Sequence, residues 1–436
     1  MTGTTTPTGT PPGTPPGLAL DALSDARPGP LAKSLPAAAD TTVGAFLATA
    51  PRLSAFGTPL LVLDGAALRD NAAHLAGWCA ERGVGLAPHG KTTMAPALWD
   101  LQLRAGAWGI TVATPSQLRV ALAFGVRRVQ LANTLVDPHA VAAVAAARDA
   151  DPDLEILSWV DSPDAVAAME AALGSAQDSA PARPLTVLVE LGGDGGRTGA
   201  RTVAEAQRVA AAVVASPVLR LGGVGGYEGA LAHDSSPAAL AAVRGYLERM
   251  AQLHRALAGE YETAEVVVTA GGSAYFDEVA DVLAGLADDR TRVLLRSGAY
   301  LVHDDGFYRG ISPFARGAGT PLRPAMHAWA RVVSTPEPGL ALLDAGKRDV
   351  PFDEGLPEPQ LLADALGSPA VALTGEITAV NDQHAFLRTD AAVRVGQVVR
   401  LGLSHPCTAF DKWQWIPVVE PGGDDPVVTD LVRTYF

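Results

Sequence analysis

Residues 185–229 read LTVLVELGGDGGRTGARTVAEAQRVAAAVVASPVLRLGGVGGYEG, and this stretch decides the fold class. It opens with an apolar run at 185–191 and passes through a glycine-rich loop into an alanine-rich segment with helical spacing at 204–214. A second apolar run follows at 219–224. Short β-branched runs are typical of buried strands, and the spacing of the apolar residues between them is typical of a helix. The stretch therefore predicts a strand, a helix and a second strand parallel to the first.

The same alternation extends from this unit in both directions along the chain. After an initial strand at 59–64, eight apolar runs are expected to form strands, at 84–88, 108–113, 128–132, 155–160, 185–191, 219–224, 265–269 and 291–296. Eight parallel strands with intervening helices over about 240 residues match the size of a (β/α)₈ TIM barrel. A doubly wound sheet is the structural alternative.

The pattern changes after Ala325. Short β-like runs separated by Pro, Gly and Asp follow, without helices of comparable length, at 328–334, 341–343, 371–380 and 394–401. We therefore expect a barrel domain over 58–320 and a C-terminal all-β domain over 321–436, with residues 18–57 as a candidate part of the β domain. Residues 1–17 are expected to form a disordered leader, because Met, Thr, Gly and Pro offer little apolar surface to bury.

Composition excludes several classes of function. Acidic residues outnumber basic ones and give a net charge of −14, which disfavours a broad basic face for nucleic acid or anionic lipid. No uninterrupted apolar run is long enough for a bilayer, and the start MTGTTTPTGT is unlike a secretory signal. Two cysteines cannot form a disulfide framework. We therefore expect a cytoplasmic protein with neither a nucleic-acid nor a membrane partner.

Polar or glycine-rich segments follow five of the expected barrel strands, where the mouth of a barrel forms. They are PHGKT at 88–92, GGDGGRTG at 192–199, GGYEG at 225–229, GGS at 271–273 and SGAY at 297–300. Lys91 is the first candidate within them, because a partly desolvated lysine loses its proton and can condense with an aldehyde. Its alternative role is that of a solvated surface lysine.

The glycine pair after the seventh barrel strand is a candidate anion site. Gly271, Gly272 and Ser273 can offer backbone N–H groups and a hydroxyl to a phosphate, although a plain tight turn explains them as well. No G-x-x-x-x-G-K-[ST] or strict G-x-G-x-x-G motif accompanies them, so the usual fingerprint of an ATP or dinucleotide site is missing.

Three further groups could contact a planar, anionic ligand. Arg197 can bind an anion or a phenolate, and Tyr227 and Tyr300 can pack against a ring. Their alternatives are a solvated loop arginine and two packing residues of the barrel rim. His384, in the sequence DQH at 382–384, could supply a base or hydrogen bonds, and a turn explains it nearly as well.

His405 and Cys407 form the sequence HPC and are a candidate metal pair. An imidazole and a thiolate two residues apart favour zinc over magnesium, and two protein ligands would leave the open positions of a catalytic metal. The alternative is a surface histidine beside a small buried thiol.

Taken together and in order, these motifs resemble the pyridoxal 5′-phosphate (PLP) enzymes of the alanine racemase fold type that include D-threonine aldolases and D-serine dehydratase-like proteins. The resemblance spans about residues 58–419 and is most specific in TPLLVLD, PHGKT, GRTG, GGS, LRSGAYLVHD, LDAGKRDVPFDEG, DQH and HPC. It implies a TIM barrel that carries PLP, a β domain that carries a divalent metal, a small D-amino acid as substrate, and a homodimer.

The resemblance also implies roles for single residues. Lys91 would hold the cofactor aldehyde as a Schiff base and move the α-proton, with His384 as a second catalytic candidate. Arg197, Tyr227, Gly271, Gly272, Ser273, Gly298 and Tyr300 would contact the cofactor, and His405 and Cys407 would bind Zn²⁺, Mn²⁺ or Mg²⁺, with zinc expected.

We therefore expect a lyase that dehydrates and deaminates a D-3-hydroxy amino acid such as D-serine or D-threonine. Cys407 favours dehydration, because the aldolases of the family carry a carboxylate at that ligand position. The alternatives are a D-threonine aldolase that releases glycine and an aldehyde, an amino-acid racemase, and a non-catalytic PLP-binding module.

Overall fold

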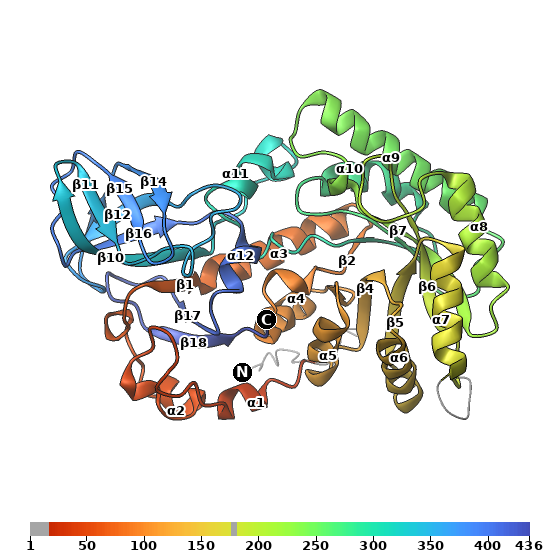
Figure 1. Ribbon diagram of the computed structural model, residues 1–436, viewed down its shortest axis with the longest axis horizontal. Coiled ribbons are helices and arrows are strands. Elements are labelled where there is room, and N and C mark those ends of the chain that lie inside the picture. The colour runs from red at the N-terminus through yellow and green to blue at the C-terminus, as the bar shows by residue number, and fades with distance from the viewer. Residues whose placement is uncertain (1–16, 176–180) are drawn as a thin grey trace, which may run out of the picture.

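Eight parallel strands form a TIM-like barrel (Figure 1). The computed structural model describes residues 17–175 and 181–436, so all of the expected leader except Gly17 lies outside the described residues. The barrel strands are β2 (Gly85–Leu86), β3 (Ile110–Val112), β4 (Arg128–Thr134), β5 (Glu155–Val160), β6 (Leu185–Leu191), β7 (Leu219–Gly226), β8 (Val266–Thr269) and β9 (Thr291–Leu295). Backbone N–H groups of Trp108 and Thr111 donate to the carbonyls of Leu86 and Pro88 at 2.7 and 2.9 Å, which joins β3 to β2.

Helices connect successive barrel strands and cover the outside of the sheet (Figure 1). The connecting helices are α4 (Pro96–Arg104), α5 (Pro115–Ala123), α6 (Pro138–Ala150), α7 (Pro163–Ser175), α8 (Val203–Val214), α9 (Pro237–Ala256) and α10 (Phe276–Leu283), and α3 (Gly65–Glu81) precedes β2. In α8, a capping box between Thr202 and Glu205 satisfies the first backbone donors, and Val209 and Val213 are buried. The doubly wound alternative is wrong, because neighbouring strands follow chain order from β3 to β9 with no switch point.

The second sheet has ten strands and lies at the left of Figure 1. Its members are β1 (Leu60–Asp64), β10 (Met326–Glu337), β11 (Leu340–Leu343), β12 (Glu358–Ala363), β13 (Ala370–Ala372), β14 (Glu376–Val380), β15 (Ala385–Arg388), β16 (Val398–Gly402), β17 (Trp415–Val419) and β18 (Val428–Arg433). All of its strand pairs are antiparallel except that of β1 with β17.

The placement of β1 corrects the domain boundary expected at residue 58. This strand pairs with β10 and β17 instead of opening the barrel domain. Its side chains alternate between two cores: Leu61 and Leu63 belong to the main core, while Leu60 and Val62 belong to a smaller one. A strand that is buried on both faces reads as a continuous apolar run, so the sequence LLVL could not show which sheet it joins.

The segment before β1 packs on the second sheet. Its short helices α1 (Asp21–Asp25) and α2 (Val43–Leu47) precede a backbone bridge between Arg52 and Val427. Val43 and Phe46 share the smaller core with Trp415 of the second sheet. The part of the segment from Val43 onward therefore lies against the antiparallel domain, along the lower edge of Figure 1. At its start, the N–H groups of Leu18 and Ala19 donate to Asp100 Oδ1 and to the Phe124 carbonyl of the barrel, at 2.8 and 3.0 Å.

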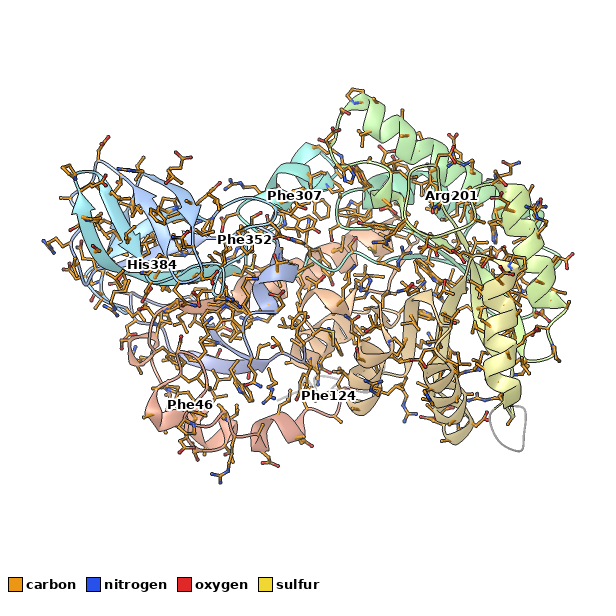
Figure 2. All side chains as sticks on the ribbon, viewed as in Figure 1. Phe46, Phe124, Arg201, Phe307, Phe352 and His384 are labelled. Atoms are coloured by element: carbon orange, nitrogen blue, oxygen red, sulfur yellow. The ribbon has the colours of Figure 1, made fainter. Side chains whose placement is uncertain are left out.

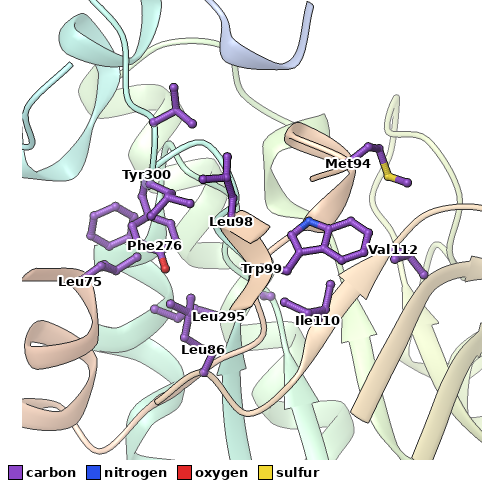
Figure 3. Close-up of a cluster of buried hydrophobic side chains, with 14 of the residues drawn as sticks. Leu75, Leu86, Met94, Leu98, Trp99, Ile110, Val112, Phe276, Leu295 and Tyr300 are labelled. Atoms are coloured by element: carbon purple, nitrogen blue, oxygen red, sulfur yellow. The ribbon is translucent and has the colours of Figure 1, made fainter. Parts of the chain in front are cut away.

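A buried cluster under the barrel mouth fixes the first barrel loop (Figure 3). Trp99 is fully buried, and its indole N–H donates to the carbonyl of Gly90 at 3.2 Å. A Cβ at Gly90 would lie 2.9 Å from both Trp99 and Ile110, so only glycine fits without displacing them. Over the described ranges, no helix combines the length and the apolarity that a membrane span needs.

Candidate active site

One cavity of about 430 Å³ collects most of the candidate residues. It lies beyond the carboxyl ends of the barrel strands, where the loops of a TIM barrel converge. The barrel contributes Lys91, Arg197, Tyr227, Gly272, Ser273, Arg296, Gly298 and Ala299. A second wall, called the opposite wall below, faces the barrel loops. It is formed by Tyr308 of α11 (Phe307–Ile311) and by His405 and Cys407 at the start of α12 (Pro406–Phe410).

Lys91 lies on a 3₁₀ turn, η3 (Gly90–Thr92), whose position depends on the contact of Gly90 with Trp99. Burial lowers the pKa of the Lys91 amine below its usual 10.5; Cys407 opposes this shift, and the positive charges of Arg197 and Arg296 reinforce it. The arrangement favours a neutral, nucleophilic amine at a lower pH than an exposed lysine requires.

Arg296 forms a fixed positive charge in the lining of the cavity and was not singled out from the sequence. Its guanidinium donates to Thr269 Oγ1 at 2.8 Å and to the carbonyl of Gly226 at 2.5 Å. It also lies 4.9 Å from the ring centroid of Trp159. The available signal was its place as the last residue of an expected strand and as the arginine of LRSGAYLVHD. With Lys91 and Arg197, it makes the cavity suited to an anionic ligand.

The glycine-rich loop after β6 carries Arg197 and is held by Arg201, which is labelled in Figure 2. The Arg201 guanidinium donates to the carbonyls of Arg197 and Thr198 at 2.7 and 2.9 Å. Arg197 itself is exposed, and its guanidinium carbon lies 4.9 Å from the ring centroid of Tyr227. Burial and then Glu228 raise the pKa of the Tyr227 phenol, so this side chain is a neutral hydrogen-bond donor.

The GGS segment differs from the expected phosphate cradle. The N–H groups of Gly271 and Gly272 already donate to the buried carboxylate of Glu228, at 3.0 and 2.6 Å. Gly271 is absent from the lining of the cavity, and its contact with the cofactor stays a prediction. Ser273 lines the cavity, and its Oγ accepts the N–H of Ala299 at 3.2 Å. This part of the wall is therefore formed by a serine hydroxyl beside the neighbouring turn.

Gly298 occupies that neighbouring turn and has no room for a side chain. A Cβ at this position would lie 2.6 Å from both the His89 carbonyl oxygen and Thr92 Oγ1. The close approach brings the loop after β9 against the loop that carries Lys91, and both loops line the cavity.

Two of the predicted site residues lie outside the lining of this cavity. Tyr300 is only 2% exposed and belongs to the buried cluster of Figure 3, where its apolar ring fills the core. His384 is exposed at the turn between β14 and β15, and Figure 2 shows it within the antiparallel domain. Within this chain neither side chain lines the cavity, so the structure does not bring them together with the other candidates, and their roles stay predictions. A tyrosine beside a barrel loop can point to either side of it, and Tyr300 points into the core.

His405 and Cys407 reach the cavity from the opposite wall. His405 has a φ of 46° and begins α12, and its Nδ1 lies 2.6 Å from Asp353 Oδ2. Burial would lower the pKa of His405, but the hydrogen bond and charge of Cys407 and then Asp353 raise it to about 9. Cys407 Sγ lies 3.6 Å from Thr92 Oγ1, next to Lys91 in the chain. The start of α12 and the turn η3, which are far apart in the sequence, therefore meet at the cavity.

The donor set at this wall fits an open metal site. Nδ1 of His405 is bound to a carboxylate, which leaves Nε2 and the sulfur of Cys407 as soft ligands suited to zinc. Within residues 17–175 and 181–436, no group of three or more His, Cys, Asp or Glu side chains could hold a metal ion. Water or a substrate oxygen would have to complete the coordination.

Comparisons with known proteins place the chain among enzymes of one fold. Residues 325–419 match the family model described as a putative serine dehydratase domain. The chain is similar to D-threonine aldolase from Filomicrobium marinum, with a TM-score of 0.72 and 25% identity over 88% of this chain and 96% of that one. It is also similar to D-threo-3-hydroxyaspartate dehydratase from Delftia sp. HT23, with a TM-score of 0.67 and 22% identity over 88% and 99% of the two chains.

A third similar structure is alanine racemase from Clostridium difficile 630, with a TM-score of 0.60 and 12% identity over 87% and 99% of the two chains. The chain has the alanine racemase fold. The predicted resemblance and the predicted pairing of a barrel with an all-β domain are thereby confirmed. No curated protein sequence matches the chain. In this alanine racemase fold, the cavity lies where the barrel mouth meets α11 and α12.

Proposed function

We propose that this protein is a PLP- and metal-dependent lyase that converts a D-3-hydroxy amino acid, such as D-serine or D-threonine, into a 2-oxo acid and ammonia. The observation that carries the proposal is the meeting of Lys91 with His405 and Cys407 in one cavity. A half-buried amine supplies the group that binds an aldehyde cofactor, and an imidazole–thiol pair supplies the ligands for a metal.

The cavity suits the charge and shape of PLP. Lys91 would carry the cofactor covalently, while the Ser273 hydroxyl beside Gly298 would bind its phosphate. Arg197 and Tyr227 would contact its ring, and Arg296 would complete a positively charged environment. When bound, PLP supplies an electron sink that lets a bond to Cα break, and the metal supplies a Lewis acid for the β-oxygen.

The protein's own groups would then move the proton and exclude water. Lys91 Nζ would accept the α-proton of the substrate, and the lowered pKa of this amine favours the neutral form that proton transfer needs. Tyr308 on α11 and the start of α12 cover the opposite side of the cavity. Loss of the α-proton together with the β-hydroxide gives dehydration, and hydrolysis then releases the 2-oxo acid and ammonia.

A D-threonine aldolase is the second candidate, because the Filomicrobium marinum aldolase reaches the highest TM-score of the three structures compared. The same residues would serve it, except that the bond between Cα and Cβ breaks and the β-hydroxyl loses its proton. The ligand Cys407 favours dehydration over this alternative.

The product formed from D-threonine tests the proposal. Purified protein loaded with PLP and Zn²⁺ is incubated with D-threonine, and 2-oxobutanoate, ammonia, glycine and acetaldehyde are measured. We expect 2-oxobutanoate and ammonia in equal amounts. Glycine and acetaldehyde would establish the aldolase, L-allo-threonine without ammonia would establish a racemase acting at Cα, and coloured but inert protein would support a binding module. Lys91→Ala is the control for each product.

The cellular setting is also part of the proposal. We propose a cytoplasmic homodimer: the motif resemblance supports the dimer, and two cysteines, too few for a disulfide framework, support the cytoplasm. Sedimentation equilibrium of the holoenzyme tests the dimer, and a mass equal to one chain would contradict it.

A further inference from the structure

The loop at 344–355 contains most of the motif LDAGKRDVPFDEG, and the proposed chemistry gives it no role. It connects β11 to β12 and passes beside α12. At its end, Asp353 Oδ2 lies 2.6 Å from His405 Nδ1, and Asp353 Oδ1 accepts a hydrogen bond from Thr408 Oγ1 at 2.6 Å. Both oxygens of the carboxylate are engaged on α12, so its orientation relative to the imidazole is fixed.

The contact with Asp353 decides which ring nitrogen of His405 is available to bind a metal ion. A histidine that binds a metal through one nitrogen usually donates its other N–H to a carboxylate or carbonyl, which sets the tautomer and the ring plane. Because Nδ1 faces Asp353, Nε2 is the nitrogen left for a ligand in the cavity. The main chain is held as well, since the N–H of His405 donates to Asp304 Oδ2 at 3.0 Å.

The rest of the loop is held from three directions. Lys33 Nζ lies 2.5 Å from Asp349 Oδ1, and the indole N–H of Trp413 donates to the Asp349 carbonyl at 2.8 Å. The N–H groups of Lys347 and Arg348 donate to the carbonyls of Asn381 and Asp382 at 2.8 and 3.2 Å. The turn that contains DQH therefore supports the loop with its backbone, and the segment before β1 supports it with a lysine.

Gly346 allows this close approach. A Cβ at Gly346 would lie 2.4 Å from the Asn381 carbonyl oxygen and 2.5 Å from that of Asp382. The two motifs that the active-site chemistry leaves unexplained, LDAGKRDVPFDEG and DQH, are thus packed against each other.

We propose that Asp353 is a positioning residue that fixes the tautomer and the ring orientation of His405 for metal binding, and that the loop at 344–355 exists to place it. The inference rests on the proposed metal role of His405 and Cys407. It goes beyond that role by naming the group that makes Nε2 the ligand atom.

Zinc affinity is the readout that tests this inference, because it does not depend on catalytic activity. Zn²⁺ is titrated into PLP-loaded protein in competition with a chromophoric chelator, and bound PLP is followed by its visible absorbance. We expect Asp353→Ala to bind Zn²⁺ about 10- to 100-fold more weakly with unchanged PLP content, the range for loss of such a partner. Asp353→Asn, which keeps an acceptor oxygen without the charge, should lose less.

The matched control is Asp411→Asn, which removes the same charge from an exposed position at the end of α12. It should leave zinc affinity unchanged. If wild-type protein binds no Zn²⁺, the proposed metal role fails and this inference fails with it. If wild type binds Zn²⁺ and both Asp353 variants match it, the inference alone is overturned. Should Asp353→Ala fail to fold, as judged by its thermal transition, the Asp353→Asn titration decides.

Discussion

The residues of the two cavity walls are positioned by different kinds of contact. The barrel wall gathers cationic and small groups from loops that follow parallel strands, so each group lies near in sequence to the strand that positions it. The opposite wall brings an imidazole and a thiol from the start of one short helix. His405 is held there by the carboxylates of Asp304 and Asp353, and Cys407 contacts Thr92, all far away in the sequence. The difference shows that the half of the site proposed to bind an anion depends on barrel topology, whereas the half proposed to bind a metal depends on long-range hydrogen bonds.

The largest expected effect tests the barrel wall. Lys91→Ala should abolish covalent attachment of PLP and lower turnover by at least about 10³-fold, within the range for loss of a positioned acid–base group. Borohydride reduction followed by peptide mass spectrometry checks the attachment, and absorbance checks residual binding. A pyridoxyl adduct on another lysine of the wild-type protein would contradict the assignment.

A smaller loss of turnover is expected when a residue of the opposite wall is substituted. His405→Ala should reduce turnover about 10²-fold or more, because a Lewis acid contributes several kcal/mol at a developing oxygen charge. The visible absorbance of bound PLP should stay, since that cofactor depends on the other wall. Metal analysis together with initial rates checks this, with exhaustive chelation of wild type as the parallel treatment. Undiminished turnover after chelation would remove the metal from the mechanism.

The pH dependence of cofactor capture tests the environment of Lys91. Its pKa is lowered, chiefly by burial, so the neutral amine fraction rises at a lower pH than for a free lysine side chain. The rate at which the cofactor-free protein captures PLP should therefore reach half its plateau below pH 10.5, the usual lysine value. Stopped-flow absorbance from pH 6 to 11, with Nα-acetyllysine as the reference amine, measures the midpoint. Coincident midpoints would show that burial has no effect on this amine.

The smallest expected effect separates a core residue from a site residue. Tyr300→Phe removes the side-chain hydrogen bond with Gln102 and should lower the free energy of unfolding by about 1 kcal/mol, the typical net value of one hydrogen bond, while the affinity for PLP stays unchanged. Urea denaturation and a PLP titration give the two numbers. Weaker PLP binding with unchanged stability would show that Tyr300 contacts the cofactor and is a residue of the site.

The sequence predicted the barrel well because each strand is a compact apolar run with a helix of clear period behind it. The runs at 155–160 and 185–191 coincide with β5 and β6. In the antiparallel domain the expected strand at 371–380 is two strands, β13 and β14. Strands with one solvent-facing side, such as β12 with its sequence EPQLLA, have too few apolar residues to stand out.

The residues of the candidate site also divide into those that the sequence could predict and those that it could not. Lys91, Arg197 and Ser273 could be found, because a residue just after a barrel strand faces the mouth. The engagement of the Gly271 and Gly272 N–H groups by Glu228 could not be found, since it depends on a contact between two different loops. Arg296 was missed because a charged residue at the end of a strand gives no sign of whether it points inward.

The main hydrophobic core extends without interruption from Leu191 and Val224 in the barrel to Leu387 and Val399 in the antiparallel domain. Two lobes that share one dry interior cannot swing apart about a hinge without exposing that interior to water. Heating should therefore melt the described chain in one calorimetric endotherm. The shared core therefore keeps the loop that carries Lys91 and the start of α12 in a fixed relative position.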